Sequence, residues 1–139
     1  MVDRERVLVK LDQLDQYLRE LRTVAPHNLE EYRRIQTKRS CERLLQVSIE
    51  CVIDVCSLLV AVLRLGLPAE EDDLFEKLRQ ADVVSDEMRE TLKRMKGLRN
   101  ILVHEYARVD DGIVFEAVRT KLADFDEFKR QALSALSQP

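Results

Sequence analysis

The sequence predicts an all-α protein, an up-and-down bundle of about five helices that forms a single domain over residues 1–139. Three observations support this fold class. Glycine and proline occur only three times each, and residues that favour helices dominate the composition. Apolar residues make up 45% of the chain and charged residues 35%, a balance typical of a folded domain with a hydrated surface. The apolar residues recur every three or four positions, as on one face of a helix.

The first helix is predicted to end before Pro26, because proline cannot continue a helix. Its apolar stripe consists of Val7, Leu11, Leu14, Leu18 and Leu21. A second helix is expected to run unbroken over residues 29–65, with Asn28 as its N-cap and Glu31 as the reciprocal partner in a capping box. A glycine and a proline shortly after this range mark its end.

The second half of the 29–65 helix carries two apolar stripes, so it is predicted to lie at the centre of the bundle or to face a second subunit as well. Residues 44–67 form the most apolar stretch of the chain. Glu50 and Asp54 interrupt this stretch near its middle, where each carboxylate would cost a few kcal/mol in a membrane. We therefore expect a buried core helix and no membrane span.

Three more helices complete the predicted bundle. One covers residues 70–81 and starts with four acidic residues, which interact favourably with the helix dipole; this run is interpreted as a hydrated helix start rather than a metal site. Another begins after the N-cap Ser85. Its expected core positions are Met88, Leu92, Met95, Leu98 and Leu102. The last helix follows the loop 110–112 and continues to residue 136.

Charge and cysteine content restrict the possible functions. A net charge of −3 means that only a local basic patch could bind nucleic acid. Charged and apolar residues alternate at the start of the chain, so no secretory signal is expected. Three cysteines without metal-type spacing (Cys41, Cys51 and Cys56) indicate reduced thiols in the cytoplasm, and neither a metal nor a cofactor is expected.

The residues best suited to chemistry lie near the end of the fourth helix. Four cations within seven residues form a local patch suited to RNA phosphates: Lys93, Arg94, Lys96 and Arg99. Arg99 offers a planar fork of N–H donors to phosphate oxygens. The imidazole of His104 can accept or donate a proton, and Tyr106 adds a hydroxyl and a ring on which a base can stack.

The spacing of Arg99 and His104 leaves their arrangement open. On a regular helix, residues five apart point about 140° away from each other. The two side chains can meet at one phosphate if the helix loosens, if Arg99 reaches round the helix, or if a two-fold axis adds a second copy. The alternative is a basic, hydrated helix end with a capping histidine.

Two carboxylates of the central helix are secondary candidates. Glu50 and Asp54 lie four residues apart and therefore share one helix face. One interpretation is a structural pairing with Arg43 or another basic side chain. The other is that one of them orients Arg99 or His104 from behind, as buried carboxylates often do for the cations of a site.

Residues 99–106 resemble the signature of the HEPN superfamily. Arg99, four residues and then His104, with the polar Asn100 directly after the arginine, match the pattern Arg-x4–6-His. Tyr106 extends this to Arg-x4-His-x-Tyr, the form found in the HepT-like toxin branch. A second segment, residues 42–54, is similar to a helix of the same family with an Arg…Gln…Ile-Glu…Ile-Asp pattern. The resemblance covers most of residues 1–136.

The resemblance implies the toxin of a type II toxin–antitoxin pair, a metal-independent endoribonuclease that acts as a homodimer. Arg99 and His104 of both chains would line one RNA cleft. Arg99 would stabilise charge on the phosphate, His104 would assist attack by the RNA 2′-hydroxyl, and Asn100 would orient the pair. The substrate would be an RNA, such as a tRNA or an mRNA, and not DNA.

The resemblance also implies a partner protein. A minimal nucleotidyltransferase, or MNT, would act as the antitoxin, and in related pairs it transfers AMP onto the motif tyrosine, here Tyr106. The alternative function is a non-catalytic nucleotide-binding, substrate-binding or regulatory subunit of such a nucleotidyltransferase. A purely structural dimerisation domain, built on the second stripe with Leu58 and Val62, is a further alternative. The intact Arg99 and His104 favour the enzyme.

Overall fold

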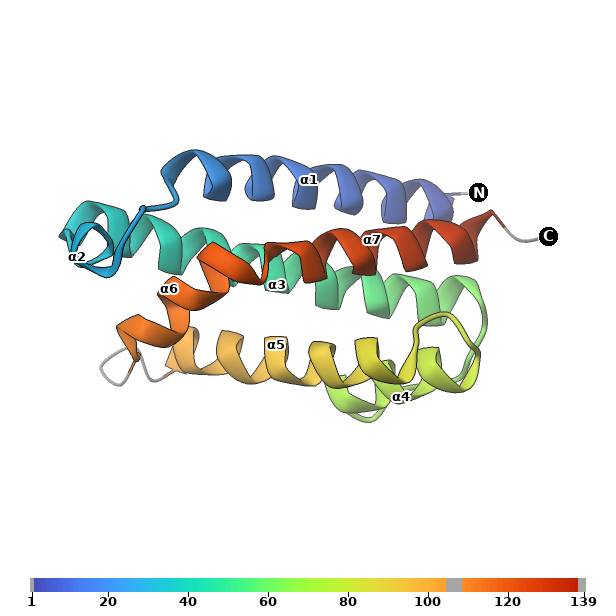
Figure 1. Ribbon diagram of the computed structural model, residues 1–139. Coiled ribbons are helices and arrows are strands. Elements are labelled where there is room, and N and C mark those ends of the chain that lie inside the picture. Colours follow the sequence, from blue (N-terminus) through green and yellow to red (C-terminus); the bar gives the residue numbers. More distant parts are fainter. Residues whose placement is uncertain (1, 105–108, 138–139) are drawn as a thin grey trace.

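The computed structural model describes residues 2–104 and 109–137, and within them the chain forms seven helices and no strand (Figure 1). The predicted all-α fold class is therefore confirmed. Four helices are long: α1 (Val2–Val24), α3 (Ile35–Val62), α5 (Asp86–His104) and α7 (Leu122–Leu136). Three are short: α2 (Leu29–Tyr32), α4 (Glu71–Gln80) and α6 (Asp111–Thr120). The expected helix count was too low because two of the predicted helices are broken.

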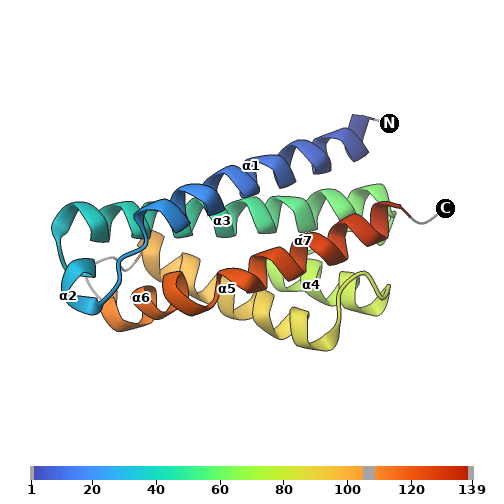
Figure 2. The ribbon, with the colours of Figure 1, turned by 45° about the horizontal axis from the view of Figure 1, so that its top comes forward.

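Helix α3 lies at the centre of the molecule and contacts each of the other six described helices. Figures 1 and 2 show α1 on one side of α3 and α5 on the opposite side. Its apolar stripes are covered, and Val52, Cys56 and Leu59 are fully buried, which confirms the predicted central helix. By length and composition α3 could cross a membrane, but 56% of its most apolar window is buried against other helices, as in the core helix of a bundle.

The prediction of one unbroken helix over residues 29–65 was wrong. The helix is interrupted after Tyr32, where Arg34 adopts an extended conformation with φ −62° and ψ 129°. Tyr32 is fully buried and its ring lies 6.1 Å from that of Phe115 in α6. No glycine or proline marks this break, so packing of Tyr32 overrides the local helical preference.

The N-cap predicted at Asn28 is confirmed, because its Oδ1 accepts a hydrogen bond from the N–H of Glu31 at 2.8 Å. The carboxylate of Glu31 turns back as expected, but it accepts from the N–H of His27 rather than from Asn28. At the other end, α3 stops at Val62 and the chain turns through Arg64 with φ 56° and Gly66 with φ 106°. The helix thus ends three residues before the predicted end at Leu65, and the left-handed residue that follows its C-cap is Arg64 rather than the glycine expected to mark the end.

The predicted last helix is also broken. Lys121, with φ −114° and ψ 8°, separates α6 from α7, and Figure 1 shows the two helices running in different directions. Val118 in α6 and Leu122 in α7 are both buried on either side of this residue. The change of direction lets both helices cover α3, and no local sequence signal announces it.

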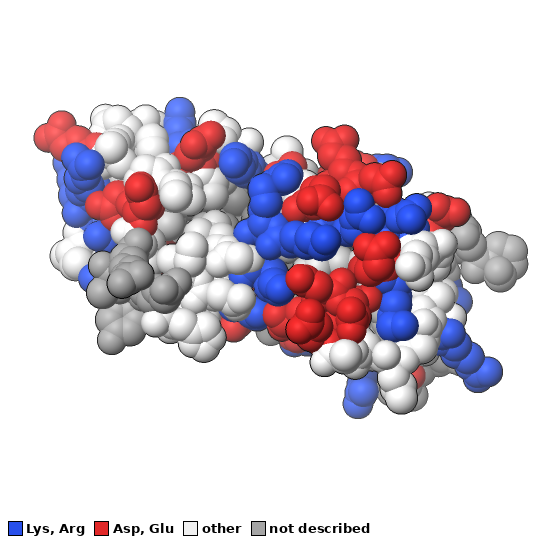
Figure 3. All heavy atoms as spheres, turned by 90° about the horizontal axis from the view of Figure 1, so that it is seen from below, with Lys and Arg blue, Asp and Glu red and all other residues white. Residues whose placement is uncertain are grey.

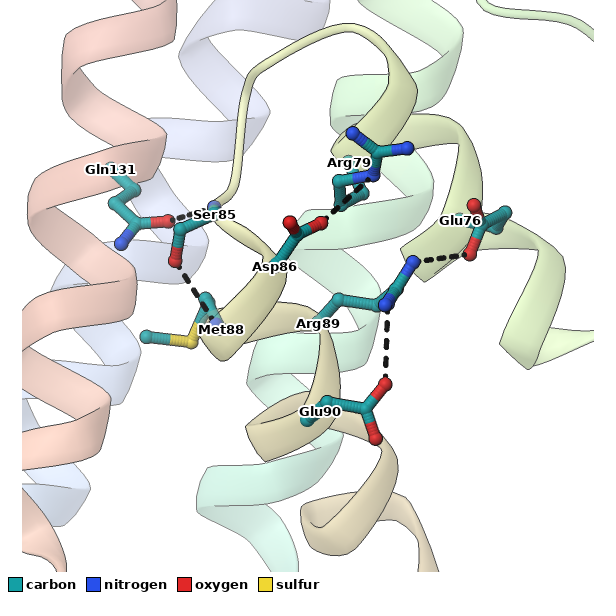
Figure 4. A network of polar contacts seen from close by, with 8 residues as sticks. All are labelled: Glu76, Arg79, Ser85, Asp86, Met88, Arg89, Glu90 and Gln131. Carbon is teal, nitrogen blue, oxygen red and sulfur yellow. Dashed lines mark hydrogen bonds and ion pairs between the residues drawn. The ribbon is translucent and has the colours of Figure 1, made fainter.

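The start of α5 is fixed by the N-cap predicted at Ser85, whose Oγ accepts a hydrogen bond from the N–H of Met88 at 3.0 Å. Gln131 of α7 accepts a further bond from the N–H of Ser85 at 3.1 Å (Figure 4). Helix α7 therefore holds the first turn of the helix that carries the candidate site. The three cysteines are free and buried, and burial raises the pKa of the Cys41 thiol to about 11.

Candidate functional site

The four cations predicted from the sequence lie on different sides of α5. Arg94 lines a hollow with residues of α6 and α7, whereas Lys96 and Arg99 lie on the face that α4 and α5 share. Figure 3 shows basic side chains in a band on this face, directly beside a cluster of acidic side chains. Lys93 and Arg94 are exposed, and Arg94 donates a hydrogen bond to the hydroxyl of Thr91 at 3.0 Å. Neither of these two residues forms an ion pair within the described residues.

The other two cations of the patch are paired with carboxylates of α4. Lys96 Nζ lies 2.6 Å from Asp72 Oδ1. Arg99 Nη2 donates to Glu71 Oε1 at 2.5 Å. RNA binding by Lys96 stays a prediction, and in the folded chain this side chain already has a carboxylate partner. The neutralising carboxylates lie more than twenty residues away in sequence, so no local spacing could indicate them.

Arg99 is held at two of its nitrogens. Besides the bond to Glu71, its Nε donates to Asn100 Oδ1 at 2.9 Å. The Arg99 side chain is only 15% exposed, whereas the Glu71 side chain is 37% exposed. Asn100 thus contacts Arg99, one of the two residues that it was expected to orient, and the orienting role stays a prediction. Among the described residues, Asn100 makes no corresponding hydrogen bond to His104.

His104 is the last residue of α5 and is exposed. The helix continues to this residue, so it does not loosen between Arg99 and His104, and the two side chains leave the axis about 140° apart. Arg99 does not reach round the helix, because Glu71 and Asn100 hold it on the α4 side. Within the described residues, neither a loosened helix nor an Arg99 side chain that reaches round the helix brings the pair together.

The remaining candidate site residues are Tyr106, Asp54 and Glu50. Tyr106 lies outside the described residues. Asp54 forms an ion pair with Lys10 of α1 at 3.1 Å, so its predicted structural pairing is confirmed, with Lys10 in place of Arg43. Asp54 and the half-buried Glu50 make no recorded contact with Arg99 or with His104 within the described part of the chain. The structure thus lends no support to an orienting role for either carboxylate.

Sequence reasoning missed the acidic start of α4 as a part of the site. It interpreted residues 70–73 as a hydrated helix start, and only part of that run has this role. Asp73 accepts hydrogen bonds from the backbone N–H groups of Ala69 and Glu70, at 2.8 and 3.3 Å. Glu71 and Asp72 contact α5 instead. The one available signal was the charge complementarity between this acidic run and the basic stretch of α5.

Residues 14–132 match the model of the family described as "Ribonuclease HepT-like". The chain belongs to this family. The predicted family and fold class are therefore confirmed, and the ribonuclease named in the family description agrees with the predicted class of activity.

Two curated relatives show how far the similarity extends. An "mRNA nuclease HepT" of Shewanella oneidensis is 36% identical over 84 residues, which are 60% of this chain and 63% of that protein, just under two thirds of its length. A "tRNA nuclease HepT" of Aphanizomenon flos-aquae is 28% identical over 139 residues, which are 98% of this chain and 95% of that protein. The second match thus spans nearly the whole of both proteins.

Solved structures share the whole fold. A toxin–antitoxin complex with AMP-PNP contains a chain with a TM-score of 0.85 and 25% identity, covering 92% of this chain and 97% of that one. A tri-AMPylated HEPN toxin of Shewanella oneidensis, in complex with an MNT antitoxin, has a TM-score of 0.85 and 26% identity, with coverage of 92% and 96%. A cytosolic protein of Bacillus subtilis, YutE, at 19% identity and a TM-score of 0.83, shows the fold alone.

Proposed function

We propose that this chain is an endoribonuclease and the toxin of a type II toxin–antitoxin pair. The observation that carries the proposal is the set of side chains that α5 presents. In a chain with a net charge of −3, this helix gathers Lys93, Arg94 and a fixed Arg99, and it ends at an exposed imidazole. Phosphate recognition and proton transfer are thereby available on one element. Family membership, and relatives described as mRNA and tRNA nucleases, support RNA as the substrate.

The proposed reaction needs no nucleophile from the protein. The RNA 2′-oxygen attacks the adjacent phosphorus, the P–O5′ bond breaks, and the products are a 2′,3′-cyclic phosphate and a 5′-hydroxyl. His104 takes the proton of the 2′-hydroxyl or supplies one to O5′, a role worth about 10²- to 10⁴-fold in rate. Arg99 stabilises the charge that develops on the phosphate oxygens. No metal ion takes part in this scheme.

We further propose that two copies pair through the outward face of α5, with both Arg99 and His104 side chains lining one cleft. Lys93, Gly97, Asn100 and His104 follow one another at intervals of four, three and four residues, which places them in one seam. A Cβ atom on Gly97 would meet nothing within 4 Å, so the fold of the single chain does not require a glycine there. A glycine at this position in the middle of α5 allows another chain to approach the helix closely.

The proposed partner is a nucleotidyltransferase antitoxin, because structurally similar chains occur in complexes with an MNT antitoxin and one of those toxins is AMPylated. AMP on Tyr106 adds a negative charge two residues from His104, which blocks the approach of an RNA phosphate. We place the protein in the cytoplasm, in agreement with its free, buried thiols.

A second candidate function is a non-catalytic regulatory subunit of the nucleotidyltransferase. The observation in its favour is that Lys96 and Arg99 already have carboxylate partners, which lowers the charge offered to RNA. This candidate predicts that RNA binding and any growth effect do not depend on His104.

Cleavage of RNA by the purified chain tests the main proposal. His104→Ala should lower the rate about 100-fold or more, because a proton-transfer group is lost. His27→Ala is the matched control, since it removes the only other histidine, an exposed residue outside α5, and should leave the rate unchanged. Activity should persist in EDTA, and mass spectrometry should show cyclic phosphate ends. Cleavage by His104→Ala at the wild-type rate, or loss of cleavage in EDTA, would contradict the proposal.

A further inference from the structure

Helix α4 begins with four consecutive carboxylates, residues 70–73, that do not share one role. Asp73 caps its own helix through the N–H groups of Ala69 and Glu70. Glu71 and Asp72 extend to α5 and pair with Arg99 and Lys96. Capping of a helix N-terminus requires only contacts with backbone N–H groups, such as those of Asp73. The pairing of Glu71 and Asp72 with side chains of α5 therefore needs another explanation.

The bond from Glu71 acts together with the bond to Asn100. Glu71 accepts from Nη2 of Arg99 at 2.5 Å, and Asn100 accepts from Nε at 2.9 Å. Two bonds at two nitrogens of a planar group fix both its position and the orientation of its plane. A guanidinium has five N–H donors, so three remain outside these two bonds and can serve a phosphate.

We infer that Glu71 is a positioning residue for Arg99 in the proposed RNA cleavage, and the inference therefore rests on that proposed function. Arg99 has a long, flexible side chain, which lies on the α4 side of α5 and not on the outward face of that helix. The bond to Glu71 holds Nη2 of the guanidinium beside α4, and the bond to Asn100 holds its Nε atom. Arg99 thus occupies one place before the substrate arrives, and an orientation set in advance lowers the barrier rather than strengthening ground-state binding.

Two other roles for Glu71 make opposite predictions. If its carboxylate only occupied the phosphate site of Arg99, its removal would raise RNA affinity and rate. If the pair only tied α4 to α5, Glu71 would behave like Glu76, which forms an ion pair with Arg89 at 3.2 Å between the same two helices (Figure 4). Glu76 is therefore the matched control, on the same helix as Glu71.

The test compares Glu71→Gln with Glu76→Gln in the full chain, with a single-stranded RNA as substrate. Glu71→Gln should lower kcat about tenfold to a hundredfold while KM changes little, because misplacement of a reacting group affects mainly the transition state. Glu76→Gln should leave kcat unchanged. The two substitutions should lower the thermal midpoint to a similar, small extent, so the difference in kcat does not report on folding.

A double-mutant cycle separates positioning from structure. In the Arg99→Ala background, Glu71→Gln should cause no further loss, because the group that it orients is already absent. An unchanged or raised kcat in Glu71→Gln, or losses that multiply with Arg99→Ala, would overturn the inference. These outcomes are distinct from failure of the proposed function, which shows as His104-independent cleavage or as no cleavage by the wild type.

Discussion

The two sides of α3 are held in different ways. Towards α1 the contact is mainly apolar, apart from the ion pair of Lys10 with Asp54. Five residues of one α1 stripe are fully buried there: Val7, Leu11, Leu14, Leu18 and Leu21. Towards the function-bearing side, α4 and α5 add ion pairs to each other: Arg79 with Asp86, Arg89 with Glu76, Lys96 with Asp72 and Arg99 with Glu71. Burying a Leu contributes about 1.5–3 kcal/mol, whereas a partly exposed ion pair contributes about 0–1 kcal/mol. The α4–α5 side also buries apolar residues, among them Phe75, Leu78 and Leu92, so both sides stabilise the fold. The ion pairs add little to that stability, which leaves the charged groups of α4 and α5 available for charge recognition.

The largest effect is expected from Leu14→Ala, which breaks the apolar side of the comparison. Leu14 is fully buried in α1, so its truncation should lower the free energy of unfolding by about 2–5 kcal/mol. Urea denaturation measures this loss. Leu8→Ala is the matched control on the same helix, because Leu8 is 46% exposed and its truncation should cost far less. Equal losses for the two variants would show that the buried residues of α1 stabilise the fold no more than its exposed residues do.

The same contrast explains what sequence reasoning could predict. Local signals marked the first helix, ended by Pro26, and the caps at Asn28 and Ser85, and the structure confirms both caps. The breaks after Tyr32 and at Lys121 carry no such signal, because they arise from packing of residues that are distant in sequence. Apolar periodicity therefore predicted the core better than the number of helices.

The candidate site was predictable to a similar extent. The motif that contains Arg99 and His104 is local, so it could be found and placed near the end of one helix. The pairing of Arg99 with Glu71 joins residues 28 positions apart through tertiary structure. A side-chain pairing of this kind depends on how α4 turns back onto α5, which a single sequence does not specify. Sequence reasoning therefore found the reacting groups but missed what holds them.

A smaller effect is expected from Gly97→Ala, which tests whether the outward face of α5 is an interface. Alanine favours the helix by about 0.5–1 kcal/mol and has room in the single chain, so the folded monomer should become slightly more stable. The added methyl group should weaken pairing of two chains and lower the cleavage rate at least about tenfold, since the proposed cleft needs both copies. Sedimentation equilibrium and the cleavage assay measure the two effects.

Ser40→Ala is the control for helix propensity, because it makes a favourable replacement at an exposed position of α3 away from this seam. It should leave both pairing and cleavage unchanged. A Gly97→Ala protein that remains fully dimeric and active would show that no chain approaches α5 closely at this residue. The interface would then have to lie elsewhere, and the composite cleft would lose its support.

The smallest effect is expected from Asp72→Asn, which sharpens the ionic side of the comparison. Asp72 forms an ion pair with Lys96, so its removal leaves one more cation on α5 without a carboxylate partner. Single-stranded RNA should then bind a few-fold more tightly at low salt, and the slope of log affinity against log salt should steepen by about 0.7.

Asp12→Asn makes the same change of charge on an exposed position of α1. Because α1 lies across α3 from α5, this control should leave the salt slope unchanged. An identical gain from both variants would mean that RNA responds to the net charge of the molecule, and the face shared by α4 and α5 would have no special part in binding.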